Sequence, residues 1–158
     1  MSDPTARLRQ CHAIEHATVA ILLERRAGRR MRVAGLSHPA GFLLACSADL
    51  HEVASAAREA RTRLAAGESH LAISEHCGTT IVLGALLTAS SVRLALARNG
   101  PFSRAVLWAA GALVVSPAIG SVLQQRFTTS ANVAQREVGA VTHLIQTPLG
   151  PLLHVSVA

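Results

Sequence analysis

Two long apolar segments in the second half of the chain limit what it can fold into. Residues 80–97 (TIVLGALLTASSVRLALA) carry one charge, Arg93, and residues 105–123 (AVLWAAGALVVSPAIGSVL) carry none. Nineteen helical residues span about 28 Å, close to the hydrocarbon thickness of a bilayer. Helices in a soluble core, the alternative, rarely reach this length without a polar face. We therefore expect a transmembrane helical hairpin, turned at 98–104.

The residues on either side of this hairpin predict a small α+β domain. Apolar residues recur at helical spacing over 5–27 and 48–66. Short apolar runs between turn residues predict strands at 31–36, 41–47, 70–74, 136–147 and 151–158. Two membrane crossings return the tail to the side of the N-terminal part, so both can contribute to one sheet. We expect a split domain with an N-terminal part at 1–78, the inserted hairpin at 79–124 and a C-terminal β-hairpin at 125–158.

The positive charge of the chain is carried by arginine alone. All fifteen basic residues are arginine, and the net charge is +6. Arginine binds the phosphates of anionic lipid head groups well, and a basic cluster near a membrane surface favours such contact. The candidate residues are Arg25, Arg26, Arg29, Arg30 and Arg32. The alternative is a solvated helix end, where arginine suits the helix dipole. No nucleic-acid partner is expected, because no aromatic residues are interleaved for base stacking.

The cysteines and the N-terminus indicate the compartment. The chain has three cysteines without paired spacing, and its first ten residues, MSDPTARLRQ, do not resemble a secretory signal. Unpaired thiols suit a reducing compartment. We expect a multi-pass membrane protein, with the lipid bilayer as a partner and the α+β domain facing the cytoplasm. The arginines flanking the apolar segments do not fix this orientation.

The motif CHAIEH, residues 11–16, is the strongest chemical signal. His12 and His16 are four residues apart, so on a helix both imidazoles point the same way. Neutral imidazoles bind divalent metals, zinc above all. Glu15 lies beside the second histidine and can take a proton from a metal-bound water. The motif therefore predicts a zinc site with Glu15 as the catalytic base.

A second cluster, SEHC at 74–77, offers further ligands. We expect the third ligand to be His76, then Cys77, then Glu75, with water in the fourth position. Cys11 is a further candidate metal ligand. The alternative is that these are ordinary polar residues at a domain surface.

His12-Ala-Ile-Glu15-His16 resembles the H-x-x-E-H signature of the inverzincins, the insulinase and pitrilysin metallopeptidases. The resemblance covers five residues of a much shorter chain. It implies a metal-dependent hydrolase whose third ligand is a downstream glutamate, a role that Glu75 could fill here.

A second resemblance covers nearly the whole chain. The segments CHAIEHATV, GESHLAISEHCGTT and RFTTSANV, the last two flanking the apolar hairpin, are similar to those of an uncharacterised family of small bacterial membrane proteins. That domain of unknown function is marked by an EHA segment and a later HCGTN-like segment, and Thr80 stands where asparagine is expected. The resemblance implies association with a bacterial membrane, which we expect to be the inner one, and a site shared by the two segments. It implies no substrate.

Three functions remain open at this point. The first is a membrane-embedded, peptidase-like zinc hydrolase. The second is a non-catalytic module that holds structural zinc through Cys11, His12, His16 and Cys77, or that ligates a metallo-tetrapyrrole. The third is a membrane-anchored assembly factor without a metal. We rank them in this order.

Overall fold

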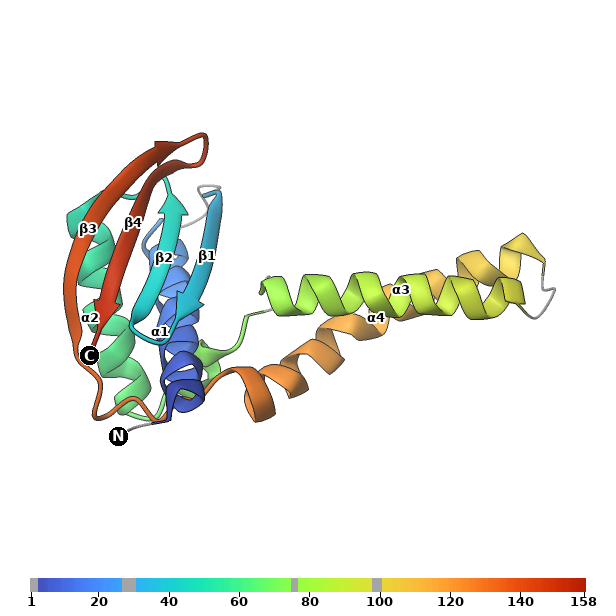
Figure 1. Ribbon diagram of the computed structural model, residues 1–158, viewed down its shortest axis with the longest axis horizontal. Helices are drawn as coiled ribbons and strands as arrows, with labels where there is room; N and C mark the ends of the chain where they lie inside the picture. Colours follow the sequence, from blue (N-terminus) through green and yellow to red (C-terminus); the bar gives the residue numbers. More distant parts are fainter. Residues whose placement is uncertain (1–2, 27–30, 75–76, 98–100) are drawn as a thin grey trace. The chain divides into compact units, whose positions relative to one another are not determined.

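The structure, a computed structural model, describes residues 3–26, 31–74, 77–97 and 101–158. The chain divides into two units (Figure 1). Residues 1–73 together with 127–158 form an α+β unit, and residues 74–126 form a helical hairpin unit. The predicted α+β fold with an inserted pair of long apolar helices is confirmed.

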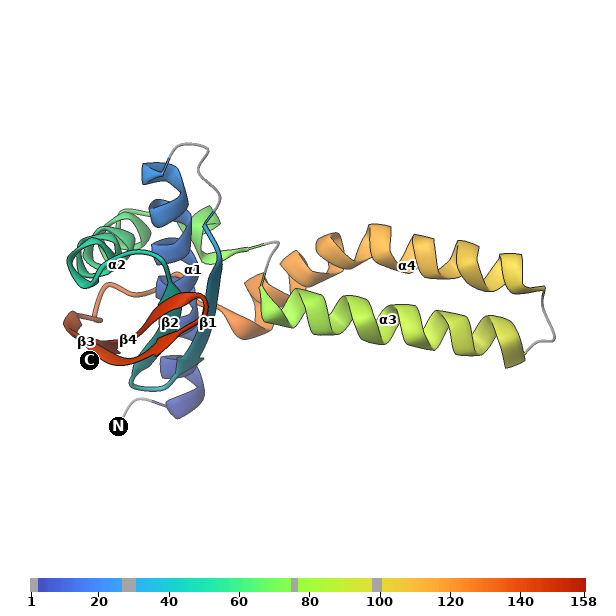
Figure 2. The ribbon, with the colours of Figure 1, turned by 90° about the horizontal axis from the view of Figure 1, so that it is seen from above.

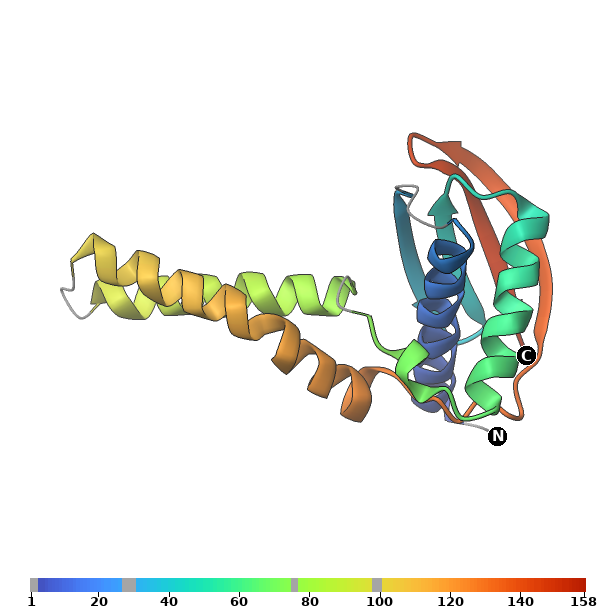
Figure 3. The same ribbon diagram turned by 180° about the vertical axis from the view of Figure 1, so that it is seen from behind.

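The α+β unit has one antiparallel sheet with two helices on one of its faces. Its elements are α1 (Pro4–Arg25), β1 (Val33–His38), β2 (Gly41–Cys46), α2 (Leu50–Ala65), β3 (Val138–Thr147) and β4 (Gly150–Val157). The strand order is β1-β2-β4-β3, so the C-terminal hairpin joins the N-terminal hairpin through β2 and β4. Figures 2 and 3 show α1 and α2 side by side against the same face of the sheet.

Alternation along the strands builds the core between the sheet and the helices. Successive strand residues point to opposite faces, and Phe42 and Leu44 of β2 are buried, as are Leu153, Val155 and Val157 of β4. The helices bury Ile14, Ile21, Leu22, Val53 and Leu64 against them. Each fully buried side chain of this size stabilises the fold by about 1.5–3 kcal/mol.

Ion pairs join the end of α1 to α2. Arg25 lies 2.6 Å from Glu59, and Arg26 lies 2.8 Å from Glu52. The hydrogen bond from Arg26 holds the pKa of Glu52 below its ordinary value. Two of the five arginines predicted to meet lipid therefore contact carboxylates, in surface pairs worth about 0–1 kcal/mol each. Two others lie outside the described residues: Arg29 and Arg30.

The predicted strand at 70–74 is wrong. This segment contains a short 3₁₀ helix, Ser69–Ala72, closed by a hydrogen bond of 3.2 Å from the Ile73 N–H to the His70 carbonyl. Leu71 and Ala72 are adjacent and both buried. A strand would have placed these neighbours on opposite faces, whereas a tight helical turn can bury both.

The hairpin unit consists of α3 (Gly78–Ala97) and α4 (Phe102–Leu123), with a π-helical turn after α4 at Gln124–Thr128. The two helices pack antiparallel, side by side (Figure 2). Both are long and apolar enough to cross a membrane. Many of their large apolar side chains are exposed, among them Leu107 (70%) and Val114 (79%).

A buried amide closes the base of this hairpin. The Gln124 side chain donates hydrogen bonds of 2.8 Å to the Ser74 carbonyl and to the Thr80 hydroxyl, and it accepts one of 2.8 Å from the Ser74 N–H. A Cβ atom at Gly120 would lie 2.6 Å from the Thr80 hydroxyl oxygen. Small residues thus let α3 and α4 approach closely, as is common between membrane helices.

We predict that Gly41→Ala destabilises the protein far more than Gly67→Ala. Both glycines have positive φ, +147° and +101°, so both substitutions incur backbone strain of about 1–2 kcal/mol. A Cβ at Gly41 would also overlap the backbone carbonyl oxygen of Val155, whereas nothing lies within 4 Å of one at Gly67. This overlap adds about 1–3 kcal/mol. Urea unfolding of the full chain in detergent, followed by circular dichroism, measures both; equal losses would contradict the close approach of β2 to β4.

Candidate metal centre

His12 and His16 lie side by side on α1. Asp3 caps this helix by accepting a hydrogen bond of 3.0 Å from the Thr5 N–H, and Pro4 begins it. Within the regular helix the two imidazoles, four residues apart, have ring centroids 4.3 Å apart and planes at 63°. His16 is buried and His12 is half-buried. The spacing of the motif therefore brings two imidazoles together, as expected.

Each ring is fixed by a backbone carbonyl. His16 Nδ1 lies 2.8 Å from the Ala72 carbonyl oxygen, and His12 Nδ1 lies 3.0 Å from the Thr128 carbonyl oxygen. A carbonyl oxygen only accepts, so each Nδ1 is the donor. In the neutral ring the lone pair then belongs to Nε2, the atom that would ligate a metal. Histidines of metal sites are oriented in this way, by donating their other N–H to a carbonyl or carboxylate.

His12, His16 and Cys77 make up a candidate metal site. One ligand atom from each lies within 4.8 Å of the other two. Cys77 directly precedes α3 and is buried, with 6% of its surface exposed. Two imidazoles and a thiolate are ligands that zinc prefers, and a tetrahedral zinc holds such atoms roughly 3.3–3.8 Å apart. The donor set thus fits zinc by its chemistry.

Glu15 is a buried carboxylate held by β1. Only 7% of its surface is exposed, and its Oε2 accepts a hydrogen bond from the Ser37 hydroxyl. A Cβ atom at Gly35 would overlap Oε1 of Glu15 and lie 2.7 Å from its Cδ. Position 35 therefore accommodates the carboxylate because it has no side chain. Glu15 follows His12 by three residues, which places their Cβ atoms about 5–6 Å apart on the helix.

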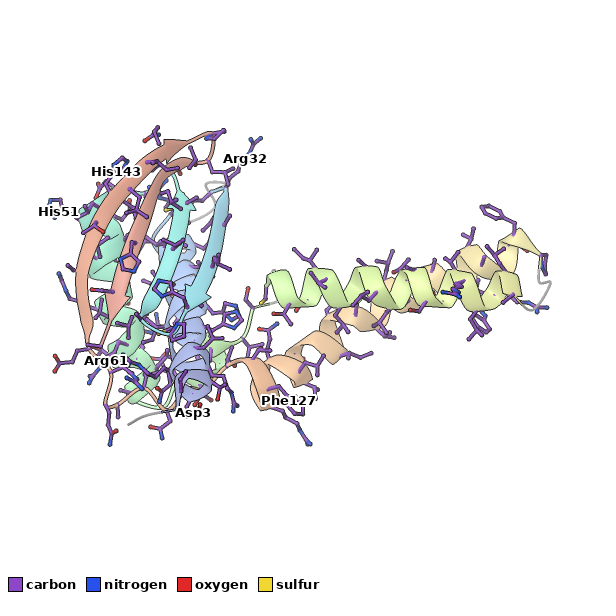
Figure 4. The ribbon with its side chains drawn as sticks, in the orientation of Figure 1. Asp3, Arg32, His51, Arg61, Phe127 and His143 are labelled. Atoms are coloured by element: carbon purple, nitrogen blue, oxygen red, sulfur yellow. The ribbon has the colours of Figure 1, made fainter. Side chains whose placement is uncertain are left out.

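The other predicted ligands divide into two groups. Cys11 is buried in the hydrophobic core, where burial raises the pKa of its thiol. It is rotated by about 100° from His12 around the helix, and it packs with apolar residues. Glu75 and His76 lie outside the described residues. Of the remaining histidines, His51 and His143 are exposed and point outward (Figure 4).

The structure adds residues that the sequence did not single out as part of the site. These are Gly35, Ser37 and the carbonyl groups of Ala72 and Thr128. A glycine inside a strand signals close approach of another group, so Gly35 could have been found. The carbonyls carried no signal, since every residue has one.

We predict that Gly35→Ala acts through Glu15. The added methyl group would displace the carboxylate and cost about 1–3 kcal/mol of stability. Most of this loss should disappear in the Glu15→Ala background, where the methyl group has room. A double-mutant cycle on the free energy of unfolding measures the coupling between the two positions. Additive losses would show that Gly35 does not accommodate the carboxylate.

This chain is similar to a protein-family model and to an uncharacterized cyanobacterial protein. The family model described as "Domain of unknown function (DUF6391)" matches residues 7–141, which include most of α1, Cys77 and both apolar helices. An uncharacterized protein of Picosynechococcus sp. is 34% identical over 145 residues, which cover 83% of this chain and 71% of that protein. No solved structure matches the chain. The family model covers well over half of the sequence, so the chain belongs to the family described as Domain of unknown function (DUF6391).

Proposed function

We propose that this protein is a membrane-embedded, zinc-dependent hydrolase. In this proposal His12, His16 and Cys77 hold the metal, and Glu15 is the general base. The observation that carries it is the fixing of both imidazoles by backbone carbonyls through Nδ1, which assigns the ligating lone pair to Nε2 in each ring. The ligating histidines of metal sites are commonly oriented by such a bond from the other ring nitrogen.

Cys77 suits the role of third ligand because of its place in the chain. It follows Ala72, whose carbonyl fixes His16, by five residues, and five extended residues span at most roughly 17 Å. Its grouping with His12 and His16 adds support. Three protein ligands leave the fourth tetrahedral position for water, as in catalytic zinc sites. The alternative, a structural zinc site, needs a fourth protein ligand. Cys11, which was predicted for that role, packs in the core.

The chemistry assigned to the chain's own residues is simple. Bound zinc would lower the pKa of its water to about 7. Glu15 would accept a proton from the attacking water, and Ser37 and Gly35 hold its carboxylate in place. The water oxygen bonds to the substrate carbonyl carbon, the bond to the leaving group breaks, and Glu15 returns the proton to the leaving group.

The bilayer is the proposed surrounding of α3 and α4. Apolar side chains exposed along two helices of this length would form an unusually large apolar surface in water. A lipid environment removes this cost, because it covers the same surface with hydrocarbon. Cys11 and Cys46 of the α+β unit are free thiols, which supports a cytoplasmic location for this unit.

Zinc content is the first prediction of this proposal. Wild-type protein purified in detergent without chelator should hold near-stoichiometric zinc, and His12→Ala, His16→Ala and Cys77→Ser should each lose it. His51→Ala is the matched control, because this histidine is exposed on α2 (Figure 4). Elemental mass spectrometry gives the readout. Absence of zinc from the supplemented wild type, or its retention in all three variants, would contradict the site. His76→Ala tests the other ligand predicted from sequence.

Loss of activity without loss of metal is the second prediction. Glu15→Gln keeps the size and the Ser37 contact of the side chain but removes the base, so kcat should fall by about 10²–10⁴ at unchanged zinc content. A library of fluorogenic peptides and esters, incubated with wild type and variant in detergent, measures this. If the variant also loses its zinc, Glu15 is a ligand or a structural residue.

A further inference from the structure

β1 forms one edge of the sheet, and this edge is unusually regular. Its six residues, VAGLSH, contain no charge and no proline, and they pair with β2 without a bulge. The opposite edge, β3, is interrupted by two register shifts against β4. Proteins protect edge strands by bulges, charges or proline, since a regular edge pairs readily with another strand. Of the two edges, only β3 has such protection among the described residues.

The register decides which backbone groups face outward from β1. The Ala40 carbonyl accepts a hydrogen bond of 2.9 Å from the Val157 N–H, so the even-numbered residues of β2 bond to β4 and the odd-numbered ones to β1. His38, paired with Gly41, closes the two-residue turn of the β1–β2 hairpin, and alternate residues of β1 bond to β2 from there. The N–H and C=O groups that point away from β2 are those of Val33, Gly35 and Ser37.

These outward-facing residues include the two that hold Glu15. Ser37 donates its hydroxyl to the carboxylate, and Gly35 makes room for it. A strand added at this edge would run about 4.8 Å from β1. Its backbone would then pass beside Glu15, the group to which the proposed function assigns proton transfer.

We propose that the outer edge of β1 binds an extended peptide as an added antiparallel strand. As a proposal about the substrate, this inference rests on the proposed function. It implies that the hydrolysed bond is a peptide bond in a peptide bound as a β-strand. Backbone hydrogen bonds supply most of the affinity, so recognition tolerates different sequences. The absence of charge along β1 and the exposed Leu36, 66% accessible, favour uncharged peptides.

The experiment uses the full-length Glu15→Gln variant in detergent, so that binding is separated from turnover. The probe is a capped octapeptide of alternating valine and threonine. We expect it to slow hydrogen exchange at the amides of Val33, Gly35 and Ser37 and to leave that of β3 unchanged. In an added strand only alternate peptide N–H groups face β1. N-methylation of those groups should weaken binding at least about tenfold, and methylation of the intervening groups should change it less than about twofold.

Three outcomes would overturn the inference. Equal effects of the two methylated series, or no protection at β1, would mean that peptides do not add to this edge. Protection that rises with protein concentration in the absence of peptide would identify a second copy of the chain as the occupant. Protection by the probe in a protein without zinc or activity would uphold the docking edge and refute the hydrolase. Hydrolysis of esters without protection at β1 would do the reverse.

Discussion

The two hydrogen bonds from the imidazoles of α1 are the constraint on which the α+β unit depends. His16 holds the carbonyl of Ala72, just before the chain leaves this unit, and His12 holds that of Thr128, just after the chain returns. The Arg9 carbonyl adds a hydrogen bond of 3.0 Å from the Ser130 N–H. One face of α1 therefore fixes both ends of the interrupted domain. The same bonds orient the two rings, so the folding of this unit and the geometry of the candidate site share one set of contacts.

The burial of Glu15 explains the composition of β1. A carboxylate removed from water is costly unless it is hydrogen-bonded, and β1 meets this need with the Ser37 hydroxyl and a glycine at position 35. Lysine or proline at these positions would protect the strand edge but would displace or neutralise the carboxylate. The lack of edge protection in β1 thus follows from the residue that it holds.

Apolar periodicity made most of the fold predictable. The helices α1 and α2, the long apolar pair and the two β-hairpins each have a period or a turn that sequence alone displays. The strand predicted at 70–74 was wrong because a five-residue apolar run does not distinguish a strand from a tight helical turn. In the structure Leu71 and Ala72 are both buried, as a helical turn allows. Outside that run, local signals and tertiary packing agree.

The site was predictable where it depends on helix spacing and not where it depends on backbone contacts. Spacing places His12, His16 and Glu15 on neighbouring positions of one helix, but the rotation by one residue turns Cys11 into the core. From the sequence, the candidate third ligands could be ranked only by their chemistry, because the position of Cys77 at the start of α3 was not known.

The two carbonyl contacts lie on either side of the insertion in the chain. His12 and His16 are one helical turn apart, about 6 Å along α1, and they fix the last residues before the insertion and the first residues after it. In the proposed site, ligation through Nε2 would leave both Nδ1 bonds intact, so the motif could hold an ion and both ends of the interrupted domain at once.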